Sequence, residues 1–261
     1  MSELESLQNE ITRLKAELAQ TKAVNQKYLQ NVAHQLTAPL GSIKWSIEAL
    51  KDERIPIGRK GVLLSSIYSQ ATILVHLIKN FALMSNLEAD HELGQFREKP
   101  EPVDIVRLAI NLANDFQPQA HELDIKIIVD NDSFKKVFGT HLIEIEKNLV
   151  AQAISNIIEN AVKYADRETA VSVSACSRGE HVGIQISSFG IPITNEEKAN
   201  IFERGFRGNS AKQKVAAGTG IGLYLALRVM KFHGGSIEVE TEGKHSCFIL
   251  IFPRSRVVLG R

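Results

Sequence analysis

The first third of the chain carries apolar residues at alternating steps of three and four. Charged and amide side chains fill most positions between them, and no Pro or Gly occurs before residue 39. A repeat averaging 3.5 residues is typical of a coiled coil, so we expect one long helix whose first 30 residues form such a coil. The apolar positions of this series are Leu4, Leu7, Ile11, Leu14 and Leu18.

The apolar series changes phase near Pro39. A second series is offset by four residues from Val32, and a phase change of this kind is a stutter in the heptad. Because proline lacks an amide donor and crowds the preceding turn, Pro39 predicts a kinked or loosened helix there. His34 lies two positions past Val32, so we expect it off the packed face and toward solvent. The second series comprises Leu36, Leu40, Ile43, Ile47 and Leu50.

A second amphipathic helix follows residues 51–60, where charge, Pro56 and Gly58 break the pattern. Its apolar residues run from Leu64 to Phe81, and we expect it to end near Leu87. Two helices with a short connection form an antiparallel hairpin. Neither can bury its apolar stripe alone, so we expect a homodimer in which two hairpins form a four-helix bundle.

The rest of the chain mixes both periodicities after a polar stretch at 88–102, which we interpret as a linker. Helical patterns cover 103–117, 145–165 and 221–233. Strand patterns cover 123–129, 170–176, 181–187, 236–240 and 246–252. This order predicts an α+β sandwich, a sheet with helices on one face.

Composition excludes several classes of protein. The 261 residues include 31 Lys and Arg against 30 Asp and Glu, and this balance gives no basis for nucleic-acid binding. Cys176 and Cys247 are too few for a disulfide framework and lack zinc-site spacing, so we expect two core residues. No apolar run approaches about 18 residues, so we expect no membrane span in this chain, and Met1 is not followed by a secretory signal.

Three segments carry candidate chemistry, and the first is AHQLTAPL at 33–40. An exposed His34 imidazole is a nucleophile near neutral pH and could accept a phosphoryl group. The alternative is an ordinary solvated histidine.

The second segment is NIIENAVKYAD at 156–166. Asn156 and Asn160 share one helix face, with Lys163 and Tyr164 within a further turn. A carboxamide oxygen suits Mg²⁺, and a nearby Lys balances phosphate charge. The alternative is that both Asn side chains hydrogen-bond the sheet beneath.

The third segment is GTGIGLYLA at 218–226. Gly218, Gly220 and Gly222 allow backbone amides to approach phosphates at a helix start, although a plain loop-to-helix connection has the same pattern. The basic stretch at 204–217 before it is typical of a mobile loop that closes over a nucleotide.

In this order, the segments resemble the cytoplasmic core of a two-component sensor histidine kinase, from about residue 22 to Pro253. The resemblance implies a coiled-coil signalling helix at 1–30, a dimerisation and histidine-phosphotransfer hairpin at 31–89, a linker at 90–102 and a Bergerat-type ATP-binding domain at 103–254. It further implies His34 as phosphoacceptor, with Gln35 beside it, and Asn160 as ligand of Mg²⁺. The implied nucleotide contacts are Asn156, Asn160, Lys163, Tyr164, Ser188, Gly190, Phe202, Arg207, Gly218, Thr219, Gly220, Gly222 and Leu223.

The sequence departs from the family pattern at four positions. Gln35 replaces an acidic residue that takes the imidazole proton, and Ala38 replaces a residue that helps place water for phosphatase activity. Ser188 stands where an Asp accepts the adenine amino group, and Pro192 replaces a glycine. The resemblance therefore implies an ATP site whose phosphate-binding half is intact and whose adenine-binding half is altered.

The resemblance implies a cytoplasmic ATP-dependent protein histidine kinase, alone or as a fragment of a membrane-anchored sensor. It would autophosphorylate on His34 and pass the phosphoryl group to an Asp of a response regulator receiver domain. The alternative, motivated by Gln35, Ser188 and Pro192, is a pseudokinase scaffold that signals through protein contacts. An ATPase of a chaperone or repair protein is disfavoured, because a His-bearing hairpin precedes the ATP domain.

Overall fold

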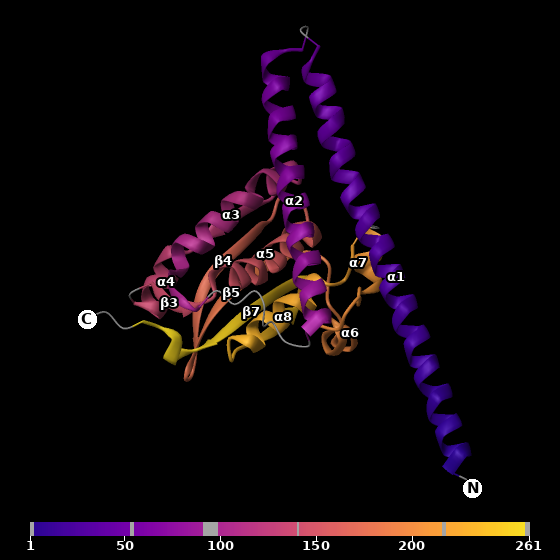
Figure 1. Ribbon diagram of the computed structural model, residues 1–261. Coiled ribbons are helices and arrows are strands. Elements are labelled where there is room, and N and C mark those ends of the chain that lie inside the picture. The colour runs from indigo at the N-terminus through magenta and orange to yellow at the C-terminus, as the bar shows by residue number, and fades with distance from the viewer. Residues whose placement is uncertain (1–2, 53–54, 91–98, 140, 216–217, 259–261) are drawn as a thin grey trace.

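The first two helices form a long hairpin in the computed structural model, which describes residues 3–52, 55–90, 99–139, 141–215 and 218–258. Helix α1 spans Glu3–Leu50 and helix α2 spans Ile57–Asp90 (Figure 1). Pro39 is buried inside α1, and the helix continues through it without a break. His34 is exposed, as its position in the pattern predicts.

Much of the apolar surface of the hairpin is open in this single chain. The exposed apolar side chains between residues 40 and 81 are Leu40, Trp45, Ile47, Ile57, Val62, Leu64, Tyr68, Val75, Ile78 and Phe81. One stretch of the described chain, Ile57–Ser85, is long and apolar enough to cross a membrane by length and composition alone, with a mean hydropathy of 1.5. The expectation of no membrane span in this chain stays a prediction, because length and composition alone do not decide it. Apolar helices of soluble proteins pass the same test, and one face of α2 packs on other helices of this chain.

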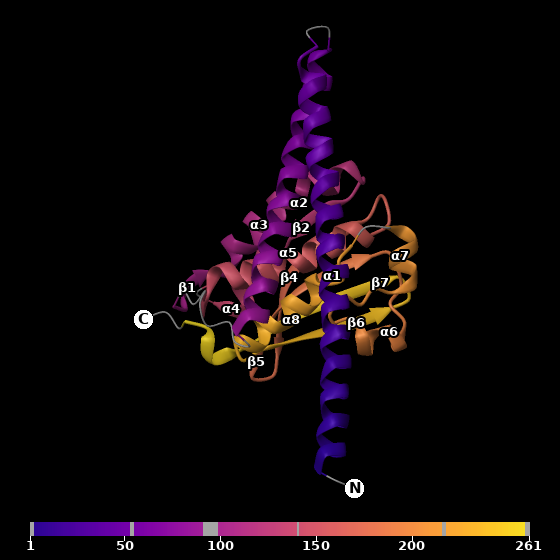
Figure 2. The same ribbon diagram turned by 45° about the vertical axis from the view of Figure 1, so that its right-hand side comes forward.

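The second part of the chain contains two sheets. A small antiparallel pair joins β1, Glu101–Asp104, to β3, Leu142–Ile145. The main sheet has the order β2-β4-β5-β7-β6, with only the β2–β4 pair parallel. Figure 2 shows its strands side by side. They are β2 Lys126–Val129, β4 Ala170–Arg178, β5 His181–Phe189, β6 Ser236–Glu242 and β7 His245–Pro253.

Three helices form the layer over this sheet: α3 Ile105–Glu122, α5 Lys147–Tyr164 and α8 Gly222–Phe232. Carboxylate side chains cap the N-termini of α3 and α5. Asp104 accepts from the Arg107 N–H, and Glu146 accepts from the N–H groups of Asn148 and Leu149. The apolar faces of the three helices and the sheet share one core. A helical hairpin followed by an α+β sandwich confirms the predicted fold class, and the dimeric four-helix bundle stays a prediction.

The sequence patterns missed the short elements. These are β1, β3, α4 Asn131–Phe138, α6 Asn195–Asn200 and α7 Asn209–Lys214. Each has four to eight residues, too few for a periodic pattern to emerge. Strand β1 begins inside the predicted linker, while residues 91–98 of that linker lie outside the described part of the chain. Both cysteines are unpaired, Cys247 buried and Cys176 partly so, as expected of core residues.

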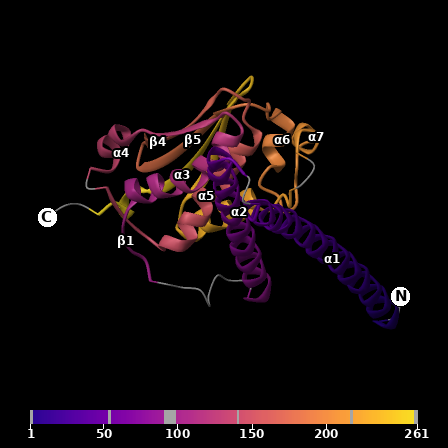
Figure 3. The ribbon, with the colours of Figure 1, turned by 90° about the horizontal axis from the view of Figure 1, so that it is seen from above.

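Helix α2 packs against α3 and α5, which joins the hairpin to the sandwich (Figure 3). His76 of α2 is 6% exposed, and its ring lies 4.8 Å from the ring of Phe116 in α3. Burial, together with the charge of Lys79, lowers the His76 pKa from 6.5 to about 4. This interface therefore requires a neutral imidazole.

The buried His76 makes stability depend on pH. Between pH 6.5 and about 4 the unfolded chain binds a proton at His76 and the folded chain does not, so the free energy of unfolding falls as pH falls through this window. We expect a loss of about 3 kcal/mol, measured by urea denaturation across the window. His76→Phe should remove this part of the pH dependence, and His121→Gln, at an exposed histidine of α3, should retain it. An identical pH profile for wild type and His76→Phe would contradict the assignment.

Candidate functional site

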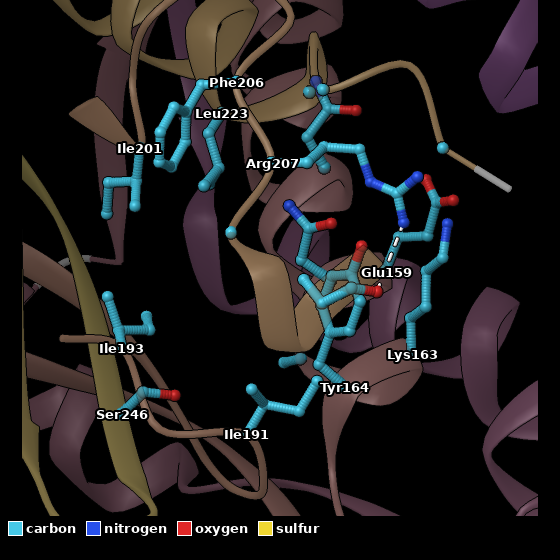
Figure 4. Close-up of a pocket in the computed structure, with 18 of the residues that line it drawn as sticks. Glu159, Lys163, Tyr164, Ile191, Ile193, Ile201, Phe206, Arg207, Leu223 and Ser246 are labelled. Atoms are coloured by element: carbon cyan, nitrogen blue, oxygen red, sulfur yellow. Dashed lines mark hydrogen bonds between the residues drawn. The ribbon is translucent and has the colours of Figure 1, made fainter. Parts of the chain in front are cut away.

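A pocket opens between α5, the strands β5 and β7, the segments around α6 and α7, and the start of α8. Side chains of the hairpin also line it, namely Gln35 of α1 with Leu77 and Asn80 of α2. Figure 4 shows that the pocket has two chemically different ends, one with apolar side chains and Ser246 and the other with charged side chains.

The apolar end is built from β5, β7 and the residues that flank α6. Its apolar lining consists of Ile191, Ile193, Ile201, Phe206, Leu223 and Phe248. Ser188 of β5 and Ser246 of β7 are register partners, and their hydroxyl oxygens lie 3.4 Å apart. Both side chains are nearly buried. An apolar slot with two hydroxyl groups suits a flat heteroaromatic ring.

The charged end holds Glu159, Lys163 and Arg207. Burial lowers the Lys163 pKa, Glu159 raises it, and the nearby Arg207 charge lowers it further. Burial raises the Glu159 pKa, partly offset by Lys163. Because two cations face one partly buried carboxylate, an additional anion at this end would be stabilised.

The glycine turn before α8 presents backbone amides to the pocket. Gly220 has φ +68, and a Cβ there would lie 2.6 Å from the carbonyl oxygen of Phe206, so only glycine fits. Helix α8 has no side-chain hydrogen bond at its N-cap residue, Ile221. A helix start without a side-chain cap has N–H groups free for an anion, and the helix dipole favours negative charge there.

Gln35 of α1 contacts this turn. With its carboxamide oxygen facing the turn, Gln35 accepts hydrogen bonds from the N–H groups of Gly218 at 3.1 Å and Thr219 at 2.8 Å. This orientation is the one that satisfies both ends of the carboxamide. The neighbouring residue is His34, so the contact holds the His-bearing segment of α1 at the turn.

A chain of carboxamides joins α2 to α5. Asn80 donates to the Asn156 carboxamide oxygen at 2.7 Å and accepts from the Gln152 amide nitrogen at 2.8 Å. The amide nitrogen of Asn156 is buried and makes no hydrogen bond within the described structure. An unpaired buried donor is costly, so this nitrogen is available to an acceptor that enters the pocket.

The segment with α6 and α7 closes over the pocket. Lys214, the last residue of α7, donates to the carbonyl oxygens of Tyr164 and Ala165 at 3.0 and 2.7 Å and pairs with Asp166 at 3.3 Å. Arg207 donates to the carbonyl oxygens of Ala211 and Val215 and packs against Gly218. The basic loop predicted to cover a nucleotide therefore contacts the C-terminal end of α5, although residues 216–217 lie outside the described chain.

The pocket gathers most of the predicted site residues and leaves out three. Those that line it are Gln35, Asn156, Asn160, Lys163, Tyr164, Ser188, Arg207, Gly218, Thr219, Gly220, Gly222 and Leu223. We expected Phe202 to line the pocket. Phe202 instead packs against the core, and Phe206 lines the pocket. Gly190 lies against the backbone of Tyr164, where a Cβ would clash, and His34 is on the exposed face of α1.

Sequence reasoning missed several lining residues. Glu159 precedes Asn160 in the motif, and its charge in an apolar helix was a usable signal. Ser246 and Asn80 gave no signal, because only the strand pairing and the packing of α2 bring them to the pocket.

The pocket fits a Mg²⁺ ion that is shared with a ligand. No group of three or more His, Cys, Asp or Glu side chains suitable for a metal occurs among the described residues. Asn160 brings a carboxamide oxygen to the pocket lining, and Mg²⁺ commonly takes one or two protein ligands plus substrate phosphates. The donor set therefore suits Mg²⁺ only together with a phosphate ligand.

The family model for histidine kinase-, DNA gyrase B- and HSP90-like ATPases matches residues 145–256. These residues include α5, the main-sheet strands β4 to β7 and the glycine turn, so this part of the chain is similar to the ATPases that this family model describes.

Curated relatives extend the match to most of the chain. SenX3 of Mycobacterium tuberculosis, a sensor-like histidine kinase, is 27% identical over 242 residues, which cover 91% of this chain and 56% of SenX3. The circadian input-output histidine kinase CikA of Synechococcus elongatus is 24% identical over 97% of this chain and 34% of its own length. The chain is thus similar to sensor histidine kinases over most of its length, and it spans about half the length, or less, of these relatives.

Solved structures share the fold. The histidine kinase AdeS of Acinetobacter baumannii superposes with a TM-score of 0.52 at 17% identity, covering 85% of this chain and 98% of AdeS. Full-length ShkA in complex with AMPPNP superposes with a TM-score of 0.54 at 20% identity, covering 87% of this chain and 45% of ShkA. At these identities the likeness concerns architecture alone.

The carboxamide contact of α2 predicts a stability effect. Asn80→Ala removes two hydrogen bonds and leaves the Asn156 oxygen without its partner, so we expect a loss of about 2 kcal/mol in the free energy of unfolding. Ser85→Ala, at an exposed position of the same helix, should change it by less than about 0.5 kcal/mol. Equal effects of the two substitutions in urea denaturation would show that Asn80 does not join the domains.

Proposed function

We propose that this chain is an ATP-dependent protein histidine kinase that autophosphorylates on His34. The observation that carries the proposal is that Gln35, the residue next to His34, lines the same pocket as the glycine turn, Lys163 and Arg207. Phosphoryl transfer to histidine requires an accessible imidazole close to the bound phosphates, and His34 is exposed and adjacent to a residue of the pocket lining.

The two ends of the pocket support a division of the nucleotide between them. The base enters the apolar end, where Ile193, Phe206 and Leu223 exclude water from its faces. The triphosphate lies toward Lys163, Arg207 and the glycine turn, because these groups supply positive charge and N–H donors. Asn160 holds Mg²⁺, which when bound neutralises charge on the phosphate oxygens.

The transfer step needs a neutral imidazole. A ring nitrogen of His34 attacks the γ-phosphorus, a nitrogen–phosphorus bond forms, the bond to the bridging oxygen breaks, and ADP leaves while the ring proton passes to water. Gln35 accepts no proton, and a general base typically contributes about 10²–10⁴-fold. Catalysis in this chain therefore depends on positioning and charge, and we expect slow turnover.

The hairpin supplies the surfaces for partners. The exposed apolar side chains of α1 and α2 support a homodimer in which two hairpins form a four-helix bundle. A receiver domain of a response regulator would approach the exposed face of α1 and take the phosphoryl group from His34 onto an Asp. We propose a cytoplasmic location, where ATP is present.

Labelling with γ-³²P-ATP and Mg²⁺ tests the activity. We expect acid-labile label on the wild type, none on His34→Gln, and labelling of the matched control His121→Gln equal to wild type. Asn160→Ala should slow labelling by about 100-fold or more, because charge on the triphosphate is no longer neutralised in place.

The outcomes separate a kinase from a scaffold. Label that survives in His34→Gln contradicts His34 as acceptor. A wild type that takes no label at any ATP concentration favours the pseudokinase scaffold, which the altered residues Gln35 and Ser188 also support.

A further inference from the structure

The floor of the apolar end carries two hydroxyl groups in place of any charged acceptor. Ser188 and Ser246 are 9% and 8% exposed, and their hydroxyl oxygens lie 3.4 Å apart across paired strands. Two carboxylates line the pocket, and neither comes from the strands β5 and β7 that carry the serines. Glu159 is at the charged end, and Glu197 accepts from the Thr194 N–H in the capping box of α6.

A hydroxyl group can form a hydrogen bond with either a donor or an acceptor on the edge of a base. It donates one hydrogen bond and accepts others, and its hydrogen rotates to suit the partner, whereas an ionised carboxylate only accepts. The amino group of adenine needs an acceptor, and the carbonyl oxygen at the corresponding position of guanine needs a donor. A carboxylate on this floor would repel the guanine oxygen, and a serine hydroxyl pairs with either group.

The walls of this end supply less discrimination between these two rings than polar groups would. The lining around the serines is apolar, with Ile191, Ile193 and Phe248 among its members. Apolar walls recognise the size and flatness of a ring and cannot strongly reject one of similar shape. Selection between adenine and guanine therefore falls on Ser188 and Ser246.

We propose that this pocket accepts purine nucleoside triphosphates of both kinds, with similar affinity for adenine and guanine nucleotides. The proposal rests on the nucleotide site proposed above and concerns only the base. It makes Ser188 and Ser246 the groups that set base selectivity, through hydroxyl hydrogens that rotate to match the ring.

Calorimetric titration of the full chain with AMPPNP and GMPPNP in Mg²⁺ tests the proposal. We expect the two dissociation constants of the wild type to agree within about tenfold. Ser188→Asp places an acceptor-only group on the floor, so it should raise the preference for AMPPNP over GMPPNP by about ten- to a hundredfold. Ser187→Asp is the matched control, because the next residue of β5 points to the opposite face of the sheet and does not line the pocket.

Each outcome has a distinct meaning. A wild type that binds AMPPNP more than tenfold tighter than GMPPNP overturns relaxed base selection and leaves the nucleotide site intact. Binding of neither nucleotide contradicts the nucleotide site itself, and this proposal with it. The wild-type ratio decides the question even where Ser188→Asp fails to fold, and equal changes in preference for the two Asp variants would overturn the role of Ser188.

Discussion

The N-terminus of α8 imposes the constraint on which the rest of this molecule depends. The helix begins at a glycine turn without a side-chain cap, so its first N–H groups need partners from elsewhere. Gly220 bends the chain with a positive φ against the backbone of Phe206, and Lys163 and Arg207 line the same pocket. Amides, cations and dipole all favour one kind of ligand, an anion with several oxygen atoms.

The hairpin contacts the glycine turn that precedes α8. The Gln35 carboxamide oxygen accepts from two amides of the turn, and Asn80 pairs with Asn156 one helix away. A triphosphate that binds the same amides has to displace Gln35. A nucleotide that bound these amides would therefore be coupled to the position of α1, because both would use one set of donors. This coupling would link a signal arriving through the hairpin to the site where chemistry occurs.

Sequence reasoning reached the features that are encoded locally. The periodic segments that form α1, α2, α5 and α8 were long enough for these helices to be predicted. The Asn and glycine motifs each lie at one end of such a helix. It failed where short elements and tertiary packing determine which residues line the pocket. Helices α6 and α7 have six residues each, and Phe206 rather than Phe202 faces the pocket because of how the loop after α6 turns. The contact of Gln35 with Gly218 joins residues far apart in the sequence, and no local pattern contains it.

The central claim is that the amides of Gly218 and Thr219 bind Gln35 in the free chain and phosphate in the occupied one. Backbone amide NMR resonances of these two residues test it most directly. The account predicts that both shift on titration with Mg²⁺ and AMPPNP, and that both also shift in nucleotide-free Gln35→Ala while amides of the distant strand β2 do not. Resonances of Gly218 and Thr219 that stay unchanged under saturating AMPPNP would contradict the account.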